Sequence, residues 1–189
     1  MEIAIYSDLH GNPAVLKTLM DNVFPTVDHI WAVGDLFYSY NKDDASKAKS
    51  TEVMETLLAY KDKPVDYIMG NTDAFEEFKA FQEVFASETF LVKEIDGLKI
   101  ILTHGHLYET ELKMQELLNE HHAKIMVYGH SHLFEIKIRD NHIFLNPGSV
   151  TLPRDENTIA TYLLLNTIEK RVQLKEINTG DILEELYIH

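Results

Sequence analysis

Residues 2–13 read EIAIYSDLHGNP, and this stretch decides the fold class. Residues 2–7 form a short, mainly apolar run of the kind that becomes a buried β-strand. Asn12 followed by Pro13 is typical of a helix start, because asparagine caps the first turn and proline fits the first helical position. A strand that leads through a polar loop into a helix begins a β–α–β unit, so we expect an α/β protein.

The alternation of strands and helices continues through the first half of the chain and changes in the second. The first half contains predicted strands at 29–33 and 65–69 and predicted helices at 45–60 and 74–85. In the second half, the turn pairs Asp96-Gly97 and Asp140-Asn141 predict two hairpins. The remaining predicted elements are a helix at 110–122 and strands at 89–95, 98–102, 124–128, 134–139, 142–145, 157–165 and 171–177. This pattern favours two sheets with helices outside them.

Composition limits the class of protein. The chain has 189 residues, of which 45% are hydrophobic and 25% charged, so one globular domain spanning residues 1–189 is expected. The absence of cysteine excludes thiol catalysis and cysteine-ligated zinc or iron–sulfur sites. The net charge of −14 argues against nonspecific binding to nucleic acid or to an anionic membrane. No run approaches the ~18 apolar residues of a membrane span and no secretory leader is recognisable, so we expect a cytoplasmic protein.

Five short polar motifs share one position, because each of them directly follows an apolar strand. They are Asp8-Leu9-His10, Gly34-Asp35, Gly70-Asn71-Thr72-Asp73, His104-Gly105-His106 and Gly129-His130-Ser131-His132. The carboxyl ends of parallel strands meet at one edge of a sheet, where α/β proteins gather their ligands. We therefore expect the five motifs to form a single site.

The donor atoms in these motifs suit first-row divalent metals. Imidazole, carboxylate and amide oxygen without thiolate favour Mn, with Fe, Zn, Ni and Co as alternatives. The seven candidate donors are Asp8, His10, Asp35, Asn71, His104, His130 and His132. Seven exceed the four ligands of a single tetrahedral site, so two metal ions are the natural number. Two ions ~3.5–4 Å apart can hold the attacking and leaving oxygens of in-line phosphoryl transfer and supply a hydroxide nucleophile at neutral pH.

In this order, the motifs resemble those of the calcineurin-like metallophosphoesterase superfamily. The stretches Leu102-Thr103-His104-Gly105-His106, Gly129-His130-Ser131-His132 and Asn146-Pro147-Gly148-Ser149 are similar to its small bacterial and archaeal phosphodiesterases, the YfcE-like family. The likeness extends from residue 3 to about residue 154. It implies a four-layer α/β/β/α sandwich, with two mixed β-sheets packed face to face and helices outside.

The resemblance also implies a role for each residue. One metal ion would be held by Asp8, His10, Asp35 and His132, and the other by Asp35, Asn71, His104 and His130, so Asp35 would bridge the two. The expected catalytic residues are Asp35, Asn71 and His106, and the expected substrate-binding residues are Asn71, Thr72, His106 and Arg154. Arg154 suits a phosphate oxygen, although its residue type alone fits an ordinary surface arginine equally well.

Thr72 marks a departure from the wider superfamily. Many members carry a histidine after the Gly-Asn pair, which is thought to protonate the leaving group, whereas a threonine hydroxyl is a poor acid. The YfcE-like group also lacks this histidine and commonly has cysteine there. The sequence therefore predicts a phosphodiesterase that acts on a small phosphate ester with an acidic leaving group.

Four other functions fit parts of the pattern. The small subunit of the retromer coat resembles this fold and has become a scaffold, but a scaffold has no reason to keep seven donors. A monoester phosphatase or nucleotidase is the enzymatic alternative. A mononuclear iron oxygenase needs two histidines and one carboxylate, which leaves Asn71 and two histidines unexplained. A serine hydrolase is disfavoured because Ser149 lacks a Gly-x-Ser-x-Gly elbow. Related proteins are often dimers or tetramers, so a homo-oligomer is a further expectation.

Overall fold

Four α-helices and eleven strands make up the described part of the chain. The computed structural model describes residues 1–37, 43–73, 79–84 and 89–189. The helices are α1 (Pro13–Thr18), α2 (Asp44–Ala59), α3 (Lys79–Val84) and α4 (Glu111–Glu120), and α1 runs on through a π-helical turn (Leu19–Val23) and a 3-10 turn (Phe24–Thr26). The strands are β1 (Glu2–Tyr6), β2 (His29–Val33), β3 (Val65–Ile68), β4 (Phe90–Ile95), β5 (Leu98–Thr103), β6 (Ile125–Val127), β7 (Phe134–Arg139), β8 (His142–Pro147), β9 (Thr161–Asn166), β10 (Arg171–Glu176) and β11 (Ile182–Tyr187).

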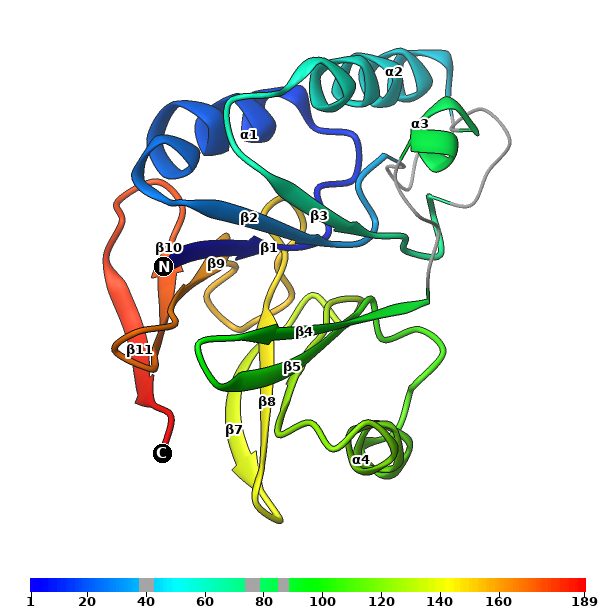
Figure 1. Cartoon of the computed structure of the whole chain (residues 1–189). Helices are drawn as coiled ribbons and strands as arrows, with labels where there is room; N and C mark the ends of the chain where they lie inside the picture. The colour runs from blue at the N-terminus through cyan, green and yellow to red at the C-terminus, as the bar shows by residue number, and fades with distance from the viewer. Residues whose placement is uncertain (38–42, 74–78, 85–88) are drawn as a thin grey trace.

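The strands form two mixed sheets that face each other (Figure 1). The first sheet has the order β11-β10-β9-β1-β2-β3, and the second has the order β4-β5-β6-β8-β7. Strands β1, β2 and β3 are parallel, as are β5, β6 and β8, whereas β4, β7, β9 and β10 pair antiparallel to their neighbours. The predicted pair of mixed sheets is confirmed.

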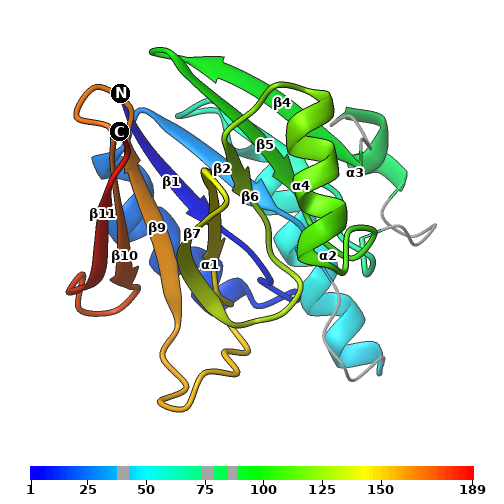
Figure 2. The same ribbon diagram turned by 90° about the horizontal axis from the view of Figure 1, so that it is seen from below.

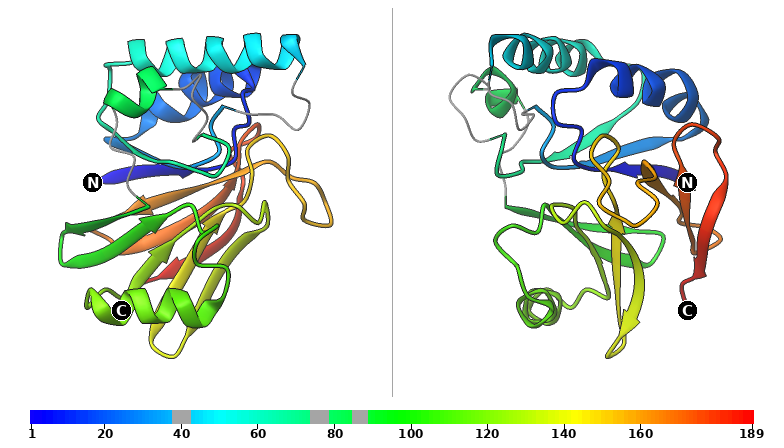
Figure 3. Two further views of the ribbon diagram at one scale, coloured as in Figure 1. Left: turned by 90° about the vertical axis from the view of Figure 1, so that its right-hand side faces the viewer. Right: turned by 180° about the vertical axis from the view of Figure 1, so that it is seen from behind.

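Helices cover the outer face of each sheet, which makes four layers (Figure 3). Helices α1 and α2 lie over the first sheet, and α4 lies over the second. Three buried hydrophobic clusters fill the spaces between these layers. The cluster between the sheets is made only of strand residues and the short segments beside them, which is why both sheets are apolar on their inner faces.

Strand β1 illustrates how one short run serves two of these clusters. Ile3 and Ile5 belong to the cluster between the sheets, whereas Ala4 and Tyr6 belong to the cluster beneath α1 and α2. All four side chains are at most 1% exposed. Because both faces of β1 are buried, its sequence is apolar throughout rather than alternating. The buried strand therefore holds Asp8, in the loop that follows it, at a fixed position on the edge of the sheet.

An ion cluster ties the two sheets together at their edges. Asp66 of β3 accepts hydrogen bonds from the Trp31 indole nitrogen at 3.1 Å and from the Lys93 ammonium of β4 at 2.6 Å. Burial alone would raise the pKa of Asp66, but the His29 and Lys93 side chains outweigh that effect and hold the pKa below its usual range. The Asp66–Lys93 ion pair joins β3 to β4, which belong to different sheets.

The structure corrects two details of the expected elements. Strand β9 begins at Thr161 rather than at residue 157, because the Asp155 carboxylate caps the backbone of Asn157 at 3.0 Å and so forms a turn. Strand β11 was not expected, since Glu184 and Glu185 interrupt its apolar residues. Of the helix expected at 74–85, the described part is Lys79–Val84, and residues 74–78 and 85 lie outside the described residues. No helix in the described ranges combines the length and apolar character that crossing a membrane requires.

Candidate metal centre

The loops that follow the parallel strands meet at one edge of the molecule. In Figure 1 the arrowheads of β1, β2 and β3 point towards this edge. The loop after β1 runs alongside the loop after β2, because Asp8 N–H donates to Gly34 O at 3.0 Å and His10 N–H to Asp35 O at 2.9 Å. In the second sheet, Gly129 N–H donates to His104 O at 3.1 Å. The motif residues are thus placed by main-chain hydrogen bonds that extend both sheets.

Two glycines allow these loops to approach one another closely. A Cβ atom at Gly70 would lie 2.1 Å from Asp35 Oδ1 and 2.2 Å from the Asp35 nitrogen. A Cβ atom at Gly129 would lie 2.0 Å from Ser7 Oγ, and Ser7 directly follows β1 of the other sheet. Any larger residue would push the loops apart, so glycine at these two positions is required by the close approach of the backbones.

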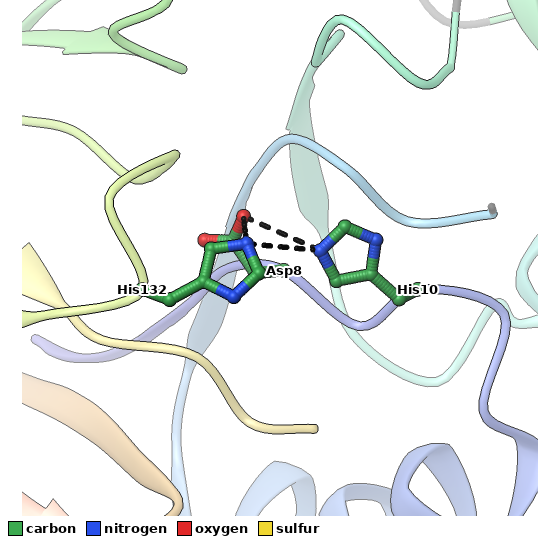
Figure 4. A group of neighbouring side chains, drawn as sticks. All are labelled: Asp8, His10 and His132. Carbon is green, nitrogen blue, oxygen red and sulfur yellow. Dashed lines mark hydrogen bonds and ion pairs between the residues drawn. The ribbon is translucent and has the colours of Figure 1, made fainter. Parts of the chain in front are cut away.

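Asp8, His10 and His132 form the first cluster of candidate ligands (Figure 4). The Nε2 atoms of the two histidines are 3.2 Å apart, and His132 Nε2 lies 3.3 Å from Asp8 Oδ1. His132 Nδ1 is 2.8 Å from Leu152 O, and a carbonyl can only accept, so Nδ1 carries the hydrogen. The lone pair of His132 Nε2 therefore faces Asp8 and His10, as a metal-binding imidazole requires.

Asp35, His104 and His130 form the second cluster. His104 Nε2 lies 3.3 Å from Asp35 Oδ1, and the His104 and His130 rings are 5.2 Å apart, centre to centre. His104 Nδ1 donates to Val33 O at 2.8 Å, so this histidine too turns its Nε2 atom towards the cluster. The two clusters adjoin, because the backbone N–H of His130 donates to Asp8 Oδ2 at 3.2 Å.

Four buried side-chain atoms at this edge lack a hydrogen bond among the described residues. Two of them, Asp8 Oδ1 and His104 Nε2, belong to the clusters, one to each. Leaving a buried acceptor without a partner costs about 1–3 kcal/mol, so such atoms call for another partner. A carboxylate oxygen and an imidazole nitrogen that converge in this way fit a cation, and the donor set of the two clusters suits a divalent transition metal.

The charge balance of the two clusters also favours a cation. Burial would lower the pKa of His104, but Asp35 and Asp8 outweigh this and raise it to about 9. Burial would raise the pKa of Asp35, but the adjacent His104 side chain and the hydrogen bond from the Thr72 backbone N–H hold it well below its usual range. His130 and His106 have lowered pKa values because of burial and the neighbouring His104. The site thus stabilises positive charge beside Asp35 while keeping two further imidazoles neutral.

The backbone at the site adopts an uncommon conformation. Five motif residues have positive φ angles between 48° and 69°. They are Asp8, His10, Asp35, His130 and His132. Residues other than glycine occupy this left-handed region rarely, and such strain persists only where the surrounding structure enforces it. The main-chain hydrogen bonds between the loops supply that enforcement.

The other residues expected at the site lie around the two clusters. Asn71 is exposed and follows β3, and the backbone N–H of Thr72 donates to Asp35 Oδ1 at 2.9 Å. The His106 ring is half-buried and lies 5.4 Å from the His104 ring. Arg154 is exposed, and its backbone N–H donates to the His132 carbonyl at 3.1 Å. The structure therefore brings all the expected residues to one edge, with Asp8, Asp35 and four histidines at its centre.

Asp73 contributes to the site although it was not among the expected site residues. Its buried carboxylate accepts hydrogen bonds from the backbone of Leu36 (2.7 Å), Phe37 (3.1 Å) and Gly70 (2.9 Å). Burial and the charge of Asp35 raise the pKa of Asp73. The carboxylate joins the loop after β2 to the loop after β3, so it positions Asp35 relative to Asn71. Its place at the end of the Gly70–Asp73 motif was the only hint in the sequence.

Ser149 plays a similar part on the other side of the site. Its hydroxyl donates to the Asp8 carbonyl at 2.9 Å and accepts from Leu152 N–H at 2.8 Å. Leu152 in turn supplies the carbonyl that orients His132. The loop after β8 therefore supports the first cluster and is not a nucleophile elbow.

Comparison with known proteins agrees with this geometry. Residues 1–170 match the family model described as the calcineurin-like phosphoesterase superfamily domain. The chain belongs to this superfamily. The expected family is thereby confirmed.

Two curated members of the calcineurin-like superfamily illustrate the relationship. Phosphodiesterase YfcE of Escherichia coli K12 is 33% identical over 187 residues, which cover 93% of this chain and 94% of YfcE. The probable metallophosphoesterase YsnB of Bacillus subtilis is 27% identical over 161 residues, which cover 84% of this chain and 80% of YsnB. Both alignments extend over most of the two chains that they compare.

Solved structures show the same fold. A phosphoesterase structure of E. coli YfcE superimposes with a TM-score of 0.75 at 20% identity and covers all of both chains. Vps29 of Entamoeba histolytica, in a crystal structure with zinc, superimposes with a TM-score of 0.67 at 20% identity over 98% of each chain. At these identities the superpositions establish the α/β/β/α sandwich and not the activity.

A Gly70→Ala substitution tests the close packing of the site. The added methyl group would overlap the backbone of Asp35, and overpacking of this kind costs about 1–3 kcal/mol. We expect the metal affinity to fall about tenfold or more because Asp35 moves. Elemental analysis of protein equilibrated with a series of metal concentrations and then desalted measures this change. The control is Gly97→Ala in the turn between β4 and β5, which strains the left-handed backbone at φ 77° but adds a Cβ that meets nothing within 4 Å. Equal metal binding by the two variants would contradict this role of Gly70.

Proposed function

We propose that this chain is a phosphodiesterase that depends on two divalent metal ions. The observation that carries the proposal is the pair of adjoining clusters Asp8/His10/His132 and Asp35/His104/His130. Each cluster combines one carboxylate with two imidazoles, and in each an imidazole Nε2 atom is oriented by a carbonyl behind it. Membership of the superfamily and the similarity to phosphodiesterase YfcE support the same reading.

The assignment of ligands follows the two clusters. Asp8, His10, Asp35 and His132 would hold one ion, and Asp35, Asn71, His104 and His130 would hold the other. Manganese is our first choice and Fe, Zn, Ni or Co are alternatives, because the donors are nitrogen and oxygen without sulfur. Two such ions, when bound, make a water nucleophilic at neutral pH and supply positive charge for an in-line displacement at phosphorus.

The remaining residues would bind the substrate and manage its protons. The half-buried His106 has one ring nitrogen, Nδ1, without a hydrogen-bond partner among the described residues, so it can turn towards a phosphate ester. Its lowered pKa keeps the ring neutral at neutral pH. Arg154, whose backbone N–H is bonded to the His132 carbonyl, would contact a phosphate oxygen with its guanidinium. Asn71 and Thr72 would face the same ester.

The expected substrate is a small phosphate diester with an acidic leaving group. Thr72 Oγ1 is buried without a hydrogen-bond partner among the described residues, and a hydroxyl is too weak an acid to protonate a basic alkoxide. A neutral His106 is likewise a weak proton donor. Diesters whose leaving groups depart without a proton are therefore favoured over alkyl monoesters. A homo-oligomeric state and a cytoplasmic location stay predictions from the sequence.

Metal loading combined with a substrate assay tests the proposal. We expect two ions per chain by elemental analysis after loading with Mn²⁺ and desalting. The loaded protein should hydrolyse bis(p-nitrophenyl) phosphate, lose that activity on chelation and recover it when Mn²⁺ is restored. One ion per chain with every ligand intact would contradict the dinuclear centre. Two ions without hydrolysis of any diester or monoester would instead favour the scaffold alternative.

A further inference from the structure

Three lysines and two histidines surround a pocket far from the candidate metal centre. The pocket has a volume of about 320 Å³ and lies where β5 and β6 begin, whereas the metal-centre motifs follow the ends of these strands. Its basic residues are Lys99, Lys124, Lys170, His122 and His189. Figure 2 places the C-terminus and the turn between β4 and β5 at this same end of the molecule. The two sites therefore lie at opposite ends of the second sheet.

Main-chain hydrogen bonds fix the positions of the three lysines, which come from separate parts of the chain. The backbone N–H of Lys124 donates to the carbonyl of Lys99 at 3.2 Å, which joins the starts of β6 and β5. The backbone N–H of Ile188 donates to the carbonyl of Lys170 at 2.7 Å, which holds the C-terminal segment against the turn between β9 and β10. The positions of the lysines are thus part of the fold.

Among the described residues no ion pair neutralises the positive charge at this pocket, although Glu94 lies opposite Lys99 in the β4–β5 pair. No acidic side chain lines the pocket, and none of the three lysine ammonium groups has an ion pair among the described residues. The acidic residues in the adjoining turns have other partners: Asp96 accepts from the Thr167 hydroxyl, and Glu169 pairs with Arg171 at 2.8 Å. The net charge of the chain is −14, so the pocket is a local region of positive charge on an acidic protein.

The floor of the pocket is apolar. Leu98, Ile125 and Ile188 line it and are 5%, 1% and 6% exposed. A concave apolar surface with a few charged groups at its rim is the usual form of a small-molecule site, and the volume lies within the usual range. The pocket therefore offers room for an apolar portion and positive charge for an anionic group of the same ligand.

We propose that this pocket binds a small molecule that combines a phosphate-type oxyanion with an apolar portion. Lysine ammonium groups bind phosphate oxygens as point charges, and three of them match a doubly charged oxyanion better than a single carboxylate. Like charges gathered in a concave surface also raise the local concentration of anions. The proposal does not depend on the activity of the metal centre, since no residue is shared between the two sites.

Titration with phenylphosphonate, followed by amide chemical shifts of the zinc-loaded ¹⁵N-labelled protein, tests this site. The phosphonate carries the oxyanion on an aromatic ring and cannot be hydrolysed at phosphorus–carbon by an esterase. We expect saturable shifts at Gly97 and Ile125 in buffer of matched ionic strength. Binding at the metal centre would instead move Gly34 and Gly70, so the two ends are read separately.

Charge removal at the rim provides the decisive comparison. The Lys99→Gln/Lys124→Gln/Lys170→Gln variant should bind about tenfold more weakly or worse, because each substitution removes a charge-assisted hydrogen bond. The control Lys47→Gln/Lys61→Gln/Lys113→Gln makes the same change in net charge elsewhere and should bind as the wild type does. If the triple variant does not fold, Lys124→Gln alone, at an exposed position, should weaken binding about threefold. An absence of saturable shifts, or equal weakening by the control, would overturn the proposal.

Discussion

Replacing Asp35 with asparagine is expected to lower phosphodiester hydrolysis by about 10³-fold or more. Asp35 is the carboxylate that would touch both ions, so its charge supports both halves of the centre. Its Oδ1 atom lies 3.3 Å from His104 Nε2 and accepts from Thr72 N–H at 2.9 Å. Asparagine keeps the accepting oxygen and tolerates the left-handed backbone at φ 52°, so the loop should stay in place. What is lost is the negative charge.

The control for this variant is Asp140→Asn. Asp140 has nearly the same backbone angle, φ 48°, and its exposed side chain lies in the turn between β7 and β8. The measurements are kcat/KM on bis(p-nitrophenyl) phosphate, the metal content and the melting temperature. Asp35→Asn should lose activity and bound metal while melting near the wild-type temperature, and Asp140→Asn should change none of the three appreciably. Turnover by Asp35→Asn within a few-fold of wild type would remove the bridging carboxylate from the mechanism.

A Thr72→His substitution is expected to increase hydrolysis of esters with basic leaving groups by about 10²-fold or more. General-acid catalysis matters most when the departing oxygen is basic, and a nitrophenolate departs without a proton. The backbone of Thr72 is tied to Asp35, so an imidazole at this position would stand beside the centre. Rates on a series of esters with graded leaving-group pKa should therefore become less sensitive to that pKa. Rates on nitrophenyl diesters should change little.

Thr72→Gln is the matched control for this substitution. Glutamine is similar in size to histidine but has no acidic proton, so it should leave the dependence on leaving-group pKa as steep as in the wild type. An unchanged dependence in a folded and fully metallated Thr72→His variant would mean that another group already protonates the leaving oxygen. His106 would then be the first residue to substitute, because its ring lies next to those of His104 and His130.

The layout of the centre follows from local features that can be read along the chain. Asp8, Asp35 and His104 each come directly after an apolar run, and parallel strands deliver such residues to one edge. A continuous apolar run also separates the residues of a buried strand from the polar loop that follows it, without reference to the rest of the fold. For this reason the donor types and their convergence could be predicted, and both clusters contain only expected residues.

The contacts that support those donors could not be read in the same way. Asp73 looks like one more polar residue of a loop, yet its carboxylate joins three backbone amides from the loops after β2 and β3. The orientation of His132 depends on Leu152, whose carbonyl reaches it from 20 residues away. Strand β11 was missed because its two central glutamates obscure the pattern of an edge strand, which needs only one paired side.

The sequence by itself determined the family, the class of site and the residues that supply its donor atoms, because these depend on short-range order along single strands and loops. The tertiary structure alone decided how the donors divide into two clusters, which imidazole nitrogen faces inward and which residues hold the strained loops. It also gathered Lys99, Lys124 and Lys170 around one pocket, although Lys124 lies 25 positions after Lys99 and Lys170 lies 46 positions after Lys124. The physical reason is that hydrogen bonds between distant segments set these distances, and no local pattern of residues encodes which segments will meet.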